Sequence, residues 1–131
     1  MKKHLAHIAL VIDDYDKAID YYINTLNFIL IEDTTLNAEK RWVLIAPSMD
    51  AATKILLAKA SNEEQMSHIG NQTGGRVFLF LHTDNFENDY QNLLYNKVKI
   101  VREPVIEKWG KVVVFEDIYG NLWDLIQPPN Y

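Results

Sequence analysis

The chain has 131 residues, of which 48% are apolar and 24% are charged, as in an ordinary globular domain. These proportions exclude a disordered tail, a collagen-like repeat and a membrane protein as the default class. The net charge is −5 and the thirteen Lys and Arg residues are scattered, which argues against nucleic acid or a membrane surface as a partner. The absence of cysteine excludes disulfides, thiolate metal sites and a cysteine nucleophile. The apolar run near the N-terminus is too short for a signal peptide, so a cytoplasmic location is expected.

The first half of the chain predicts a strand, a helix and three further strands. Residues 5–12 form an apolar run that is typical of a buried strand. Asp13 and Asp14 then offer an N-cap for a helix, and Asn27 is expected to end it. The apolar residues of that helix recur at spacings of three and four: Tyr15, Ala18, Ile19, Tyr22, Ile23 and Leu26. The three strands are expected at 28–31, 41–46 and 54–58.

The second half repeats this order. A strand at 76–83 is followed by a helix that Asp84 can cap, with Phe86, Tyr90, Leu93 and Leu94 on one face. Further strands are expected at 99–102, 111–116 and 122–127, with a turn at 117–121. A shift of 71 residues aligns the two halves, except that the final strands align at 68. The sequence therefore predicts a single domain made of repeat one (about 4–60), a linker (about 61–75) and repeat two (about 76–127). The linker is expected to begin with a short helix and to end in a glycine-rich connector.

Two stretches carry a resemblance to a known family. They are the segment from His7 to Tyr22 and the segment from Val114 to Leu125. Together with the duplicated strand-helix-three-strand unit, they resemble the vicinal oxygen chelate superfamily of glyoxalases, bleomycin-resistance proteins and extradiol dioxygenases. The resemblance covers nearly the whole chain and implies an α+β fold of two paired βαβββ modules. In such proteins the modules form half-barrel sheets around one pocket, and the paired modules come from one chain or from two subunits. A homodimer is expected here.

The resemblance also implies four metal-ligand positions, one on the first and one on the last strand of each repeat. Here they are occupied by His7, Leu56, Phe78 and Asp124, so that two of the four are apolar. A divalent metal held by only two protein ligands is labile. We therefore expect no cofactor, although His7 and Asp124 can hold a divalent metal weakly.

His7 and Asp124 are also the candidate catalytic residues. Asp124 interrupts an apolar strand, where a carboxylate needs a partner, a proton or a wet cavity. His7 is the expected partner for an acid/base pair, and its alternative is a histidine satisfied within the core.

The candidate substrate pocket is formed by Trp42, Leu56, Arg76, Phe78 and Trp109. Arg76 has the same strand parity as Phe78 and can hold an anionic group, or it is a solvated arginine at a strand start. Trp42 and Trp109 can form walls for a flat ligand, or they pack in the core or at an interface.

Two functions remain open for a protein of this kind. The first is an enzyme with a small-molecule substrate and a degenerate metal site, either a glyoxalase-like lyase or a dioxygenase-like oxidoreductase. The second is a metal-free protein of the bleomycin-resistance type, which binds or sequesters a hydrophobic or aromatic compound. Both imply a small-molecule ligand as the partner.

Overall fold

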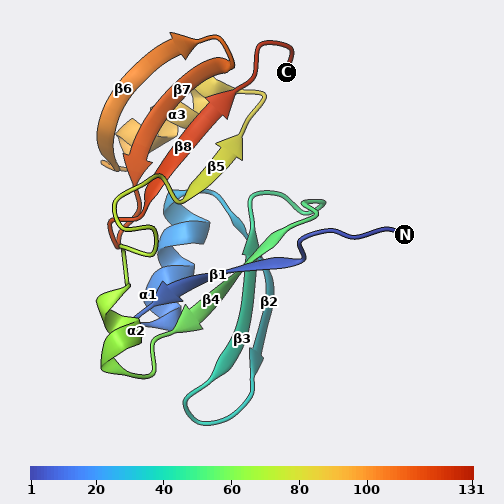
Figure 1. Cartoon of the computed structure of the whole chain (residues 1–131), viewed down its shortest axis with the longest axis vertical. Coiled ribbons are helices and arrows are strands. Elements are labelled where there is room, and N and C mark those ends of the chain that lie inside the picture. Colours follow the sequence, from blue (N-terminus) through green and yellow to red (C-terminus); the bar gives the residue numbers. More distant parts are fainter. The chain divides into compact units, whose positions relative to one another are not determined.

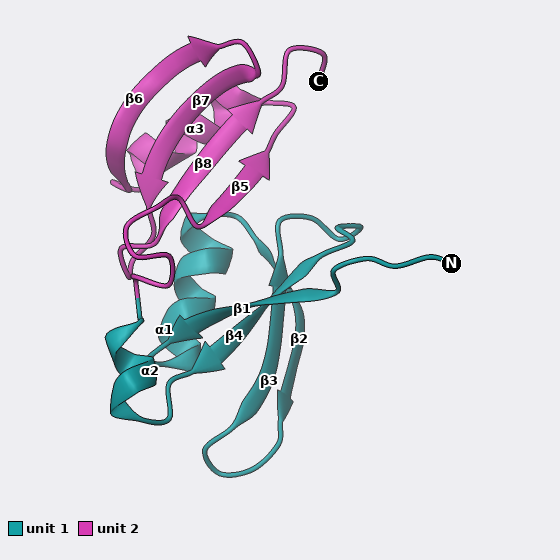
Figure 2. Ribbon diagram, in the orientation of Figure 1, with its two compact units in different colours: residues 1–69 teal, residues 70–131 magenta.

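The computed structural model describes residues 1–131, which divide into two compact units, residues 1–69 and 70–131 (Figure 2). The boundary falls inside the predicted linker, between its short helix and its glycine-rich connector. Each unit contains one four-stranded sheet, and each is described by itself below.

Unit 1 contains one sheet with the strand order β1-β4-β3-β2, in which β1 and β4 are parallel (Figure 1). Its strands are β1 (His7–Ile12), β2 (Ile29–Thr35), β3 (Arg41–Ala46) and β4 (Lys54–Lys59). Its helices are α1 (Tyr15–Asp20), the π-helical turn η1 (Tyr21–Thr25) and α2 (Glu63–Ser67). The predicted order of elements is confirmed, and β2 runs four residues beyond its predicted end at residue 31.

The helix of unit 1 begins and ends where the sequence predicts. The Asp14 carboxylate accepts a hydrogen bond from the Lys17 backbone N–H at 3.0 Å, which satisfies a free donor of the first turn. Asn27 has a φ of 61° and stops the helix after η1. Tyr15, Ala18 and Tyr22 are buried, so the predicted apolar stripe faces the core.

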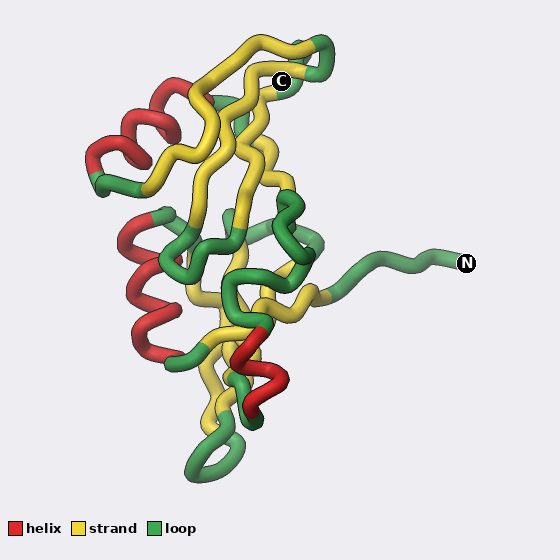
Figure 3. Tube along the Cα trace, turned by 60° about the vertical axis from the view of Figure 1, so that its left-hand side comes forward, coloured by secondary structure: helices red, strands yellow, loops and turns green.

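Unit 2 contains a second four-stranded sheet with the strand order β5-β8-β7-β6, in which β5 and β8 are parallel. Its strands are β5 (Leu79–His82), β6 (Lys99–Glu107), β7 (Gly110–Glu116) and β8 (Leu122–Gln127). Its helix is α3 (Phe86–Tyr95), which lies along one face of the sheet (Figure 3). Both sheets are open, so each unit has the curved βαβββ form that the resemblance implies.

Two sequence predictions for unit 2 are wrong in their bounds. The strand predicted from Arg76 begins at Leu79, because the preceding connector turns at Gly74 and Gly75, both with positive φ. The N-cap of α3 is Asn85 rather than Asp84, since the Asn85 side chain accepts the hydrogen bond from the Asn88 N–H. The correction leaves the repeat intact.

The 71-residue shift still relates the two N-caps, Asp14 and Asn85. The 68-residue shift relates β4 to β8.

The strand predicted at 99–102 is also longer than the sequence indicates, and β6 extends to Glu107 with two register shifts against β7. Pro104 is tolerated there because an edge strand leaves one side of its backbone unpaired.

Each sheet has one face buried against its helix and an opposite face that carries several of the candidate site residues. In unit 1, Leu10, Val43, Ile45 and Leu57 are buried on the helix side. In unit 2, Val113, Phe115, Trp123 and Leu125 are buried on the α3 side. Because side chains alternate along a strand, the intervening residues lie on the opposite face. No helix in the structure is long and apolar enough to cross a membrane.

Candidate functional site

The face of unit 1 opposite α1 is apolar at its centre. Leu56 on β4 pairs with Ala9 on β1 and with Leu44 on β3, and Leu44 pairs in turn with Glu32 on β2. This row places three aliphatic side chains side by side, with a carboxylate only at the edge strand. Leu56, at a position that the resemblance assigns to a metal ligand, therefore lies among aliphatic neighbours.

His7 lies on the same face as Leu56 and contacts an aromatic residue. Its ring meets the Trp42 ring edge-on, with the centroids 5.9 Å apart. The His7 Nδ1–H donates to the Ala6 carbonyl oxygen at 2.6 Å, which leaves Nε2 as the acceptor nitrogen. His7 is exposed and not a core residue, so the alternative of a histidine satisfied within the core is wrong.

A pocket of about 750 Å³ opens beside this face. Trp42, Leu56 and Ala58 contribute its apolar wall, and Lys40, Ser61 and Gln65 are among its polar lining residues. The structure thus brings together two of the predicted pocket residues, Trp42 and Leu56. A volume in this range is typical of a site for a small organic molecule.

The rim of this pocket is fixed by a network around Arg41. Its guanidinium donates two hydrogen bonds to Asp33, at 2.6 and 3.1 Å, and a third to Asp16 at 2.9 Å. It also lies over the Tyr15 ring. These hydrogen bonds lower the pKa of the Asp33 carboxyl and raise that of Arg41. The network ties β2 and β3 to the start of α1.

The corresponding face of unit 2 carries a row of apolar and charged side chains in register across its four strands. Phe80 on β5 pairs with Asp124 on β8, Asp124 with Val114 on β7, and Val114 with Arg102 on β6. Phe80 is 64% exposed, and Arg102 is exposed as well. We call Phe80, Asp124, Val114 and Arg102 the unit 2 row. Neither Phe80 nor Arg102 was predicted as a site residue from the sequence.

Asp124 is the anomalous member of this row. Its Oδ1 atom is buried and has no hydrogen-bond partner. Burial raises the pKa of the Asp124 carboxyl, and the positive charge of Arg102 acts against this shift. A buried carboxylate oxygen without a donor is costly, and the side chain as a whole is only half-buried, so the Asp124 carboxylate is a candidate for contact with a ligand.

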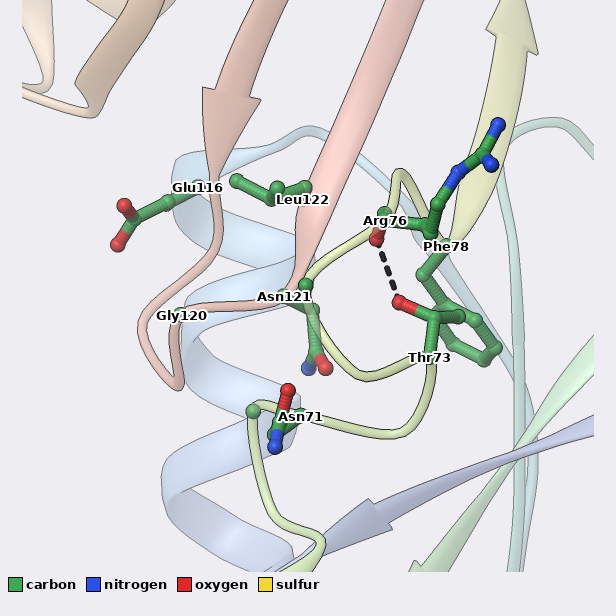
Figure 4. A pocket seen from close by; sticks show the side chains of 10 residues that line it. Asn71, Thr73, Arg76, Phe78, Glu116, Gly120, Asn121 and Leu122 are labelled. Carbon is green, nitrogen blue, oxygen red and sulfur yellow. Dashed lines mark hydrogen bonds between the residues drawn. The ribbon is translucent and has the colours of Figure 1, made fainter.

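A second pocket, of about 260 Å³, lies in unit 2 where the glycine-rich connector meets the β7–β8 turn (Figure 4). Arg76 and Phe78, both predicted pocket residues, line it together with Asn71, Thr73 and Asn121. In Figure 4 the Arg76 guanidinium points away from the amides of Asn71 and Asn121. Thr73 donates a hydrogen bond to the Arg76 carbonyl oxygen, which holds the connector in its turn.

The β7–β8 turn is fixed from within, as the sequence predicts for residues 117–121. Asp117 is buried, and its Oδ1 accepts hydrogen bonds from the backbone N–H groups of Tyr119 and Asn121. Its Oδ2 accepts a third hydrogen bond from the Asn121 side chain at 2.9 Å. The connector lies directly against this turn, since a Cβ on Gly70 would overlap the Tyr119 carbonyl oxygen.

Trp109, the remaining predicted pocket residue, lies in the turn between β6 and β7. Trp109 is 59% exposed, and it lines neither of the two pockets described above.

The donor set of this chain does not fit the metal centre that the resemblance implies. The four ligand positions supply one imidazole and one carboxylate, from His7 and Asp124, and the other two are Leu56 and Phe78. No group of three or more His, Asp or Glu side chains able to hold a metal is present. A protein-bound divalent metal normally has at least three protein donors.

Comparison with known proteins assigns the family. Residues 4–125 match the model of the Glyoxalase/Bleomycin resistance protein/Dioxygenase superfamily. The chain belongs to this superfamily. An uncharacterized protein of Shewanella frigidimarina is 54% identical over 128 residues, which cover 97% of this chain and 95% of the relative.

Solved structures of superfamily members extend the likeness to the whole fold. A member from Sphaerobacter thermophilus has a TM-score of 0.78 and 28% identity, over 96% of this chain and 98% of its own. TnmS3, an antibiotic binding protein from Streptomyces sp. CB03234, has a TM-score of 0.77 and 27% identity, over 97% of both chains. These similarities confirm the predicted family and the paired βαβββ fold.

Proposed function

We propose that this chain binds and sequesters a hydrophobic or aromatic small molecule without using a metal. The observation that carries the proposal is the pocket of about 750 Å³ in unit 1, whose wall contains Trp42 and Leu56. An indole offers a flat apolar surface for stacking. Leu56 places an aliphatic side chain at a position that the resemblance assigns to a metal ligand. Similarity to TnmS3, an antibiotic binding protein, supports the same class of function.

The binding chemistry follows from the residues of that face. A flat ligand beside Trp42 removes apolar area from water at the ligand, the indole and Leu56 together. The exposed polar residues at the rim, Lys40 and Gln65, remain in water and can contact polar substituents of the ligand. No proton transfer or bond cleavage is required for this function.

The direct test is isothermal titration calorimetry with 2-naphthol as a neutral, planar probe. We expect Trp42→Ala to weaken binding about 10-fold, because an aromatic contact contributes about 0.5–1.5 kcal/mol beyond its buried area. Tyr95→Ala is the matched control, since Tyr95 is 86% exposed on α3 and outside this pocket. Equal affinity of the wild type and Trp42→Ala, or binding that requires added Mn²⁺ or Ni²⁺, would contradict the proposal.

The second candidate function is an enzyme of the lyase or dioxygenase type, with His7 and Asp124 as its acid/base residues. It is favoured by one observation at each residue: the free Nε2 of His7 and the unpartnered Oδ1 of Asp124. This candidate requires that the wild type turns over a small-molecule substrate. His7→Gln should then abolish turnover and leave binding of that substrate intact. Binding without turnover by either protein supports sequestration instead.

A further inference from the structure

The unit 2 row contains two polar groups whose bonding capacity is unused. The Asp124 Oδ1 atom is buried without a hydrogen-bond donor. The Arg102 guanidinium forms no salt bridge or side-chain hydrogen bond, and it acts on Asp124 through its charge alone. Both groups lie on the face that is not covered by α3.

The sheet sets the spacing of these groups. Asp124 and Arg102 are in register two strands apart, with Val114 between them. Neighbouring strands are about 4.8 Å apart, so the two backbones are separated by about 10 Å. Val114 is a compact apolar spacer, and Phe80 adds an exposed ring on the far side of Asp124. The row thus presents an acceptor and a cation on either side of a short apolar surface.

The charges decide which ligand fits this surface. Arg102 attracts an anion and repels a cation, so an ammonium group beside Asp124 is disfavoured. A neutral O–H or N–H donor can bond to the half-buried Asp124 carboxylate without adding positive charge. A carboxylate matches the planar guanidinium through paired hydrogen bonds. A single aromatic ring between the donor and the carboxylate spans the Val114 surface.

We infer that the unit 2 row binds an aromatic acid that carries a hydroxyl or amino donor one ring length from its carboxylate. The donor bonds to the half-buried Asp124 carboxylate, the ligand's carboxylate bonds to Arg102, and the ring packs on Val114 beside Phe80. The inference goes beyond the proposed function, because it assigns a second binding surface, in unit 2, with its own chemical class of ligand and two residues that select it.

The test compares 4-hydroxybenzoate, benzoate and phenol by isothermal titration calorimetry. We expect 4-hydroxybenzoate to bind about 10-fold more tightly than benzoate, which lacks the donor, and than phenol, which lacks the anion. Asp124→Leu removes the preference over benzoate, and Arg102→Gln removes the preference over phenol. Lys108→Gln is the charge-matched control, because Lys108 is exposed in the β6–β7 turn and outside the row.

Three results would overturn the inference. They are equal affinity for all three probes, a preference that survives in both row variants, and loss of the carboxylate preference in Arg76→Gln instead of Arg102→Gln. Folding of each variant is checked by thermal unfolding. If 2-naphthol binding still depends on Trp42 while the benzoate series shows no preference, the proposed function stands and this inference alone fails. If neither 2-naphthol nor any of the benzoate probes binds, both fail.

Discussion

Replacing Asp124 with leucine is expected to stabilise the protein while removing its selectivity. The 68-residue shift between β4 and β8 makes Leu56 the counterpart of Asp124, so the substitution gives unit 2 the residue that unit 1 already has. Leu56 lies between Ala9 and Leu44, whereas Asp124 lies between Phe80 and Val114. Both environments accept an aliphatic side chain.

The magnitude follows from the buried oxygen. A buried polar atom without a hydrogen-bond partner costs about 1–3 kcal/mol. Phe80 is 64% exposed and can move to accommodate the larger side chain, which limits the strain from added volume. We expect Asp124→Leu to gain about 1–2 kcal/mol, which raises the Tm by about 3–8 °C for a chain of this size. Such a gain is typical of residues kept for binding rather than for stability.

The assay is thermal unfolding by differential scanning calorimetry at neutral pH, with the reverse exchange as its control. Leu56→Asp places a carboxylate among aliphatic side chains and is expected to cost about 2–4 kcal/mol. Asp124→Asn retains the shape of the side chain without its charge and should fall between the wild type and Asp124→Leu. If both substitutions of Asp124 lower the Tm, its carboxylate has a favourable partner in the folded protein and the reasoning from the unpartnered oxygen is refuted.

Three further predictions concern pH, metal and assembly. Because Arg41 lowers the pKa of Asp33 below its ordinary 3.8, this pair stabilises the fold above that pH and ceases to do so as the pH falls. Asp33→Asn should therefore lower the Tm at pH 7 but much less at pH 2.5, and an equal loss at both would contradict this. Protein purified without chelator should contain far less than one equivalent of zinc, nickel, manganese or iron after dialysis, by elemental analysis. We propose a homodimer, since open sheets leave edges to be covered; light scattering should give twice the chain mass, and a clean monomer would refute it.

The sequence predicts the architecture well because the two halves of the chain carry the same order of strands and helix. The apolar stripe from Tyr15 to Leu26, the capping carboxylate of Asp14 and the left-handed Asn27 are local signals, and the structure confirms each. The start of α3 fails because two local signals compete there. Asp84 and Asn85 are both good caps, and it is the Asn85 side chain that accepts the hydrogen bond from the Asn88 N–H.

The sequence also marks Asp124 as unusual, since a carboxylate interrupts an apolar strand, and it indicates Trp42 and Leu56 as wall residues. It does not indicate Arg102 or the unpartnered state of Asp124. An arginine at the end of a predicted strand gives no sign of which face it occupies, because that depends on the register with the neighbouring strand.

The amino-acid sequence by itself determines the duplicated βαβββ order and the linker, since these depend on residue type and spacing along the chain. Only the tertiary structure decides which side chains share a face. Between Ile100 and Arg102 the register of β6 against β7 shifts, so that Arg102 rather than Val101 pairs with Val114. A bulge of this kind adds one residue to one strand and re-aims those that follow. That one-residue shift places a cation in the same row as Asp124.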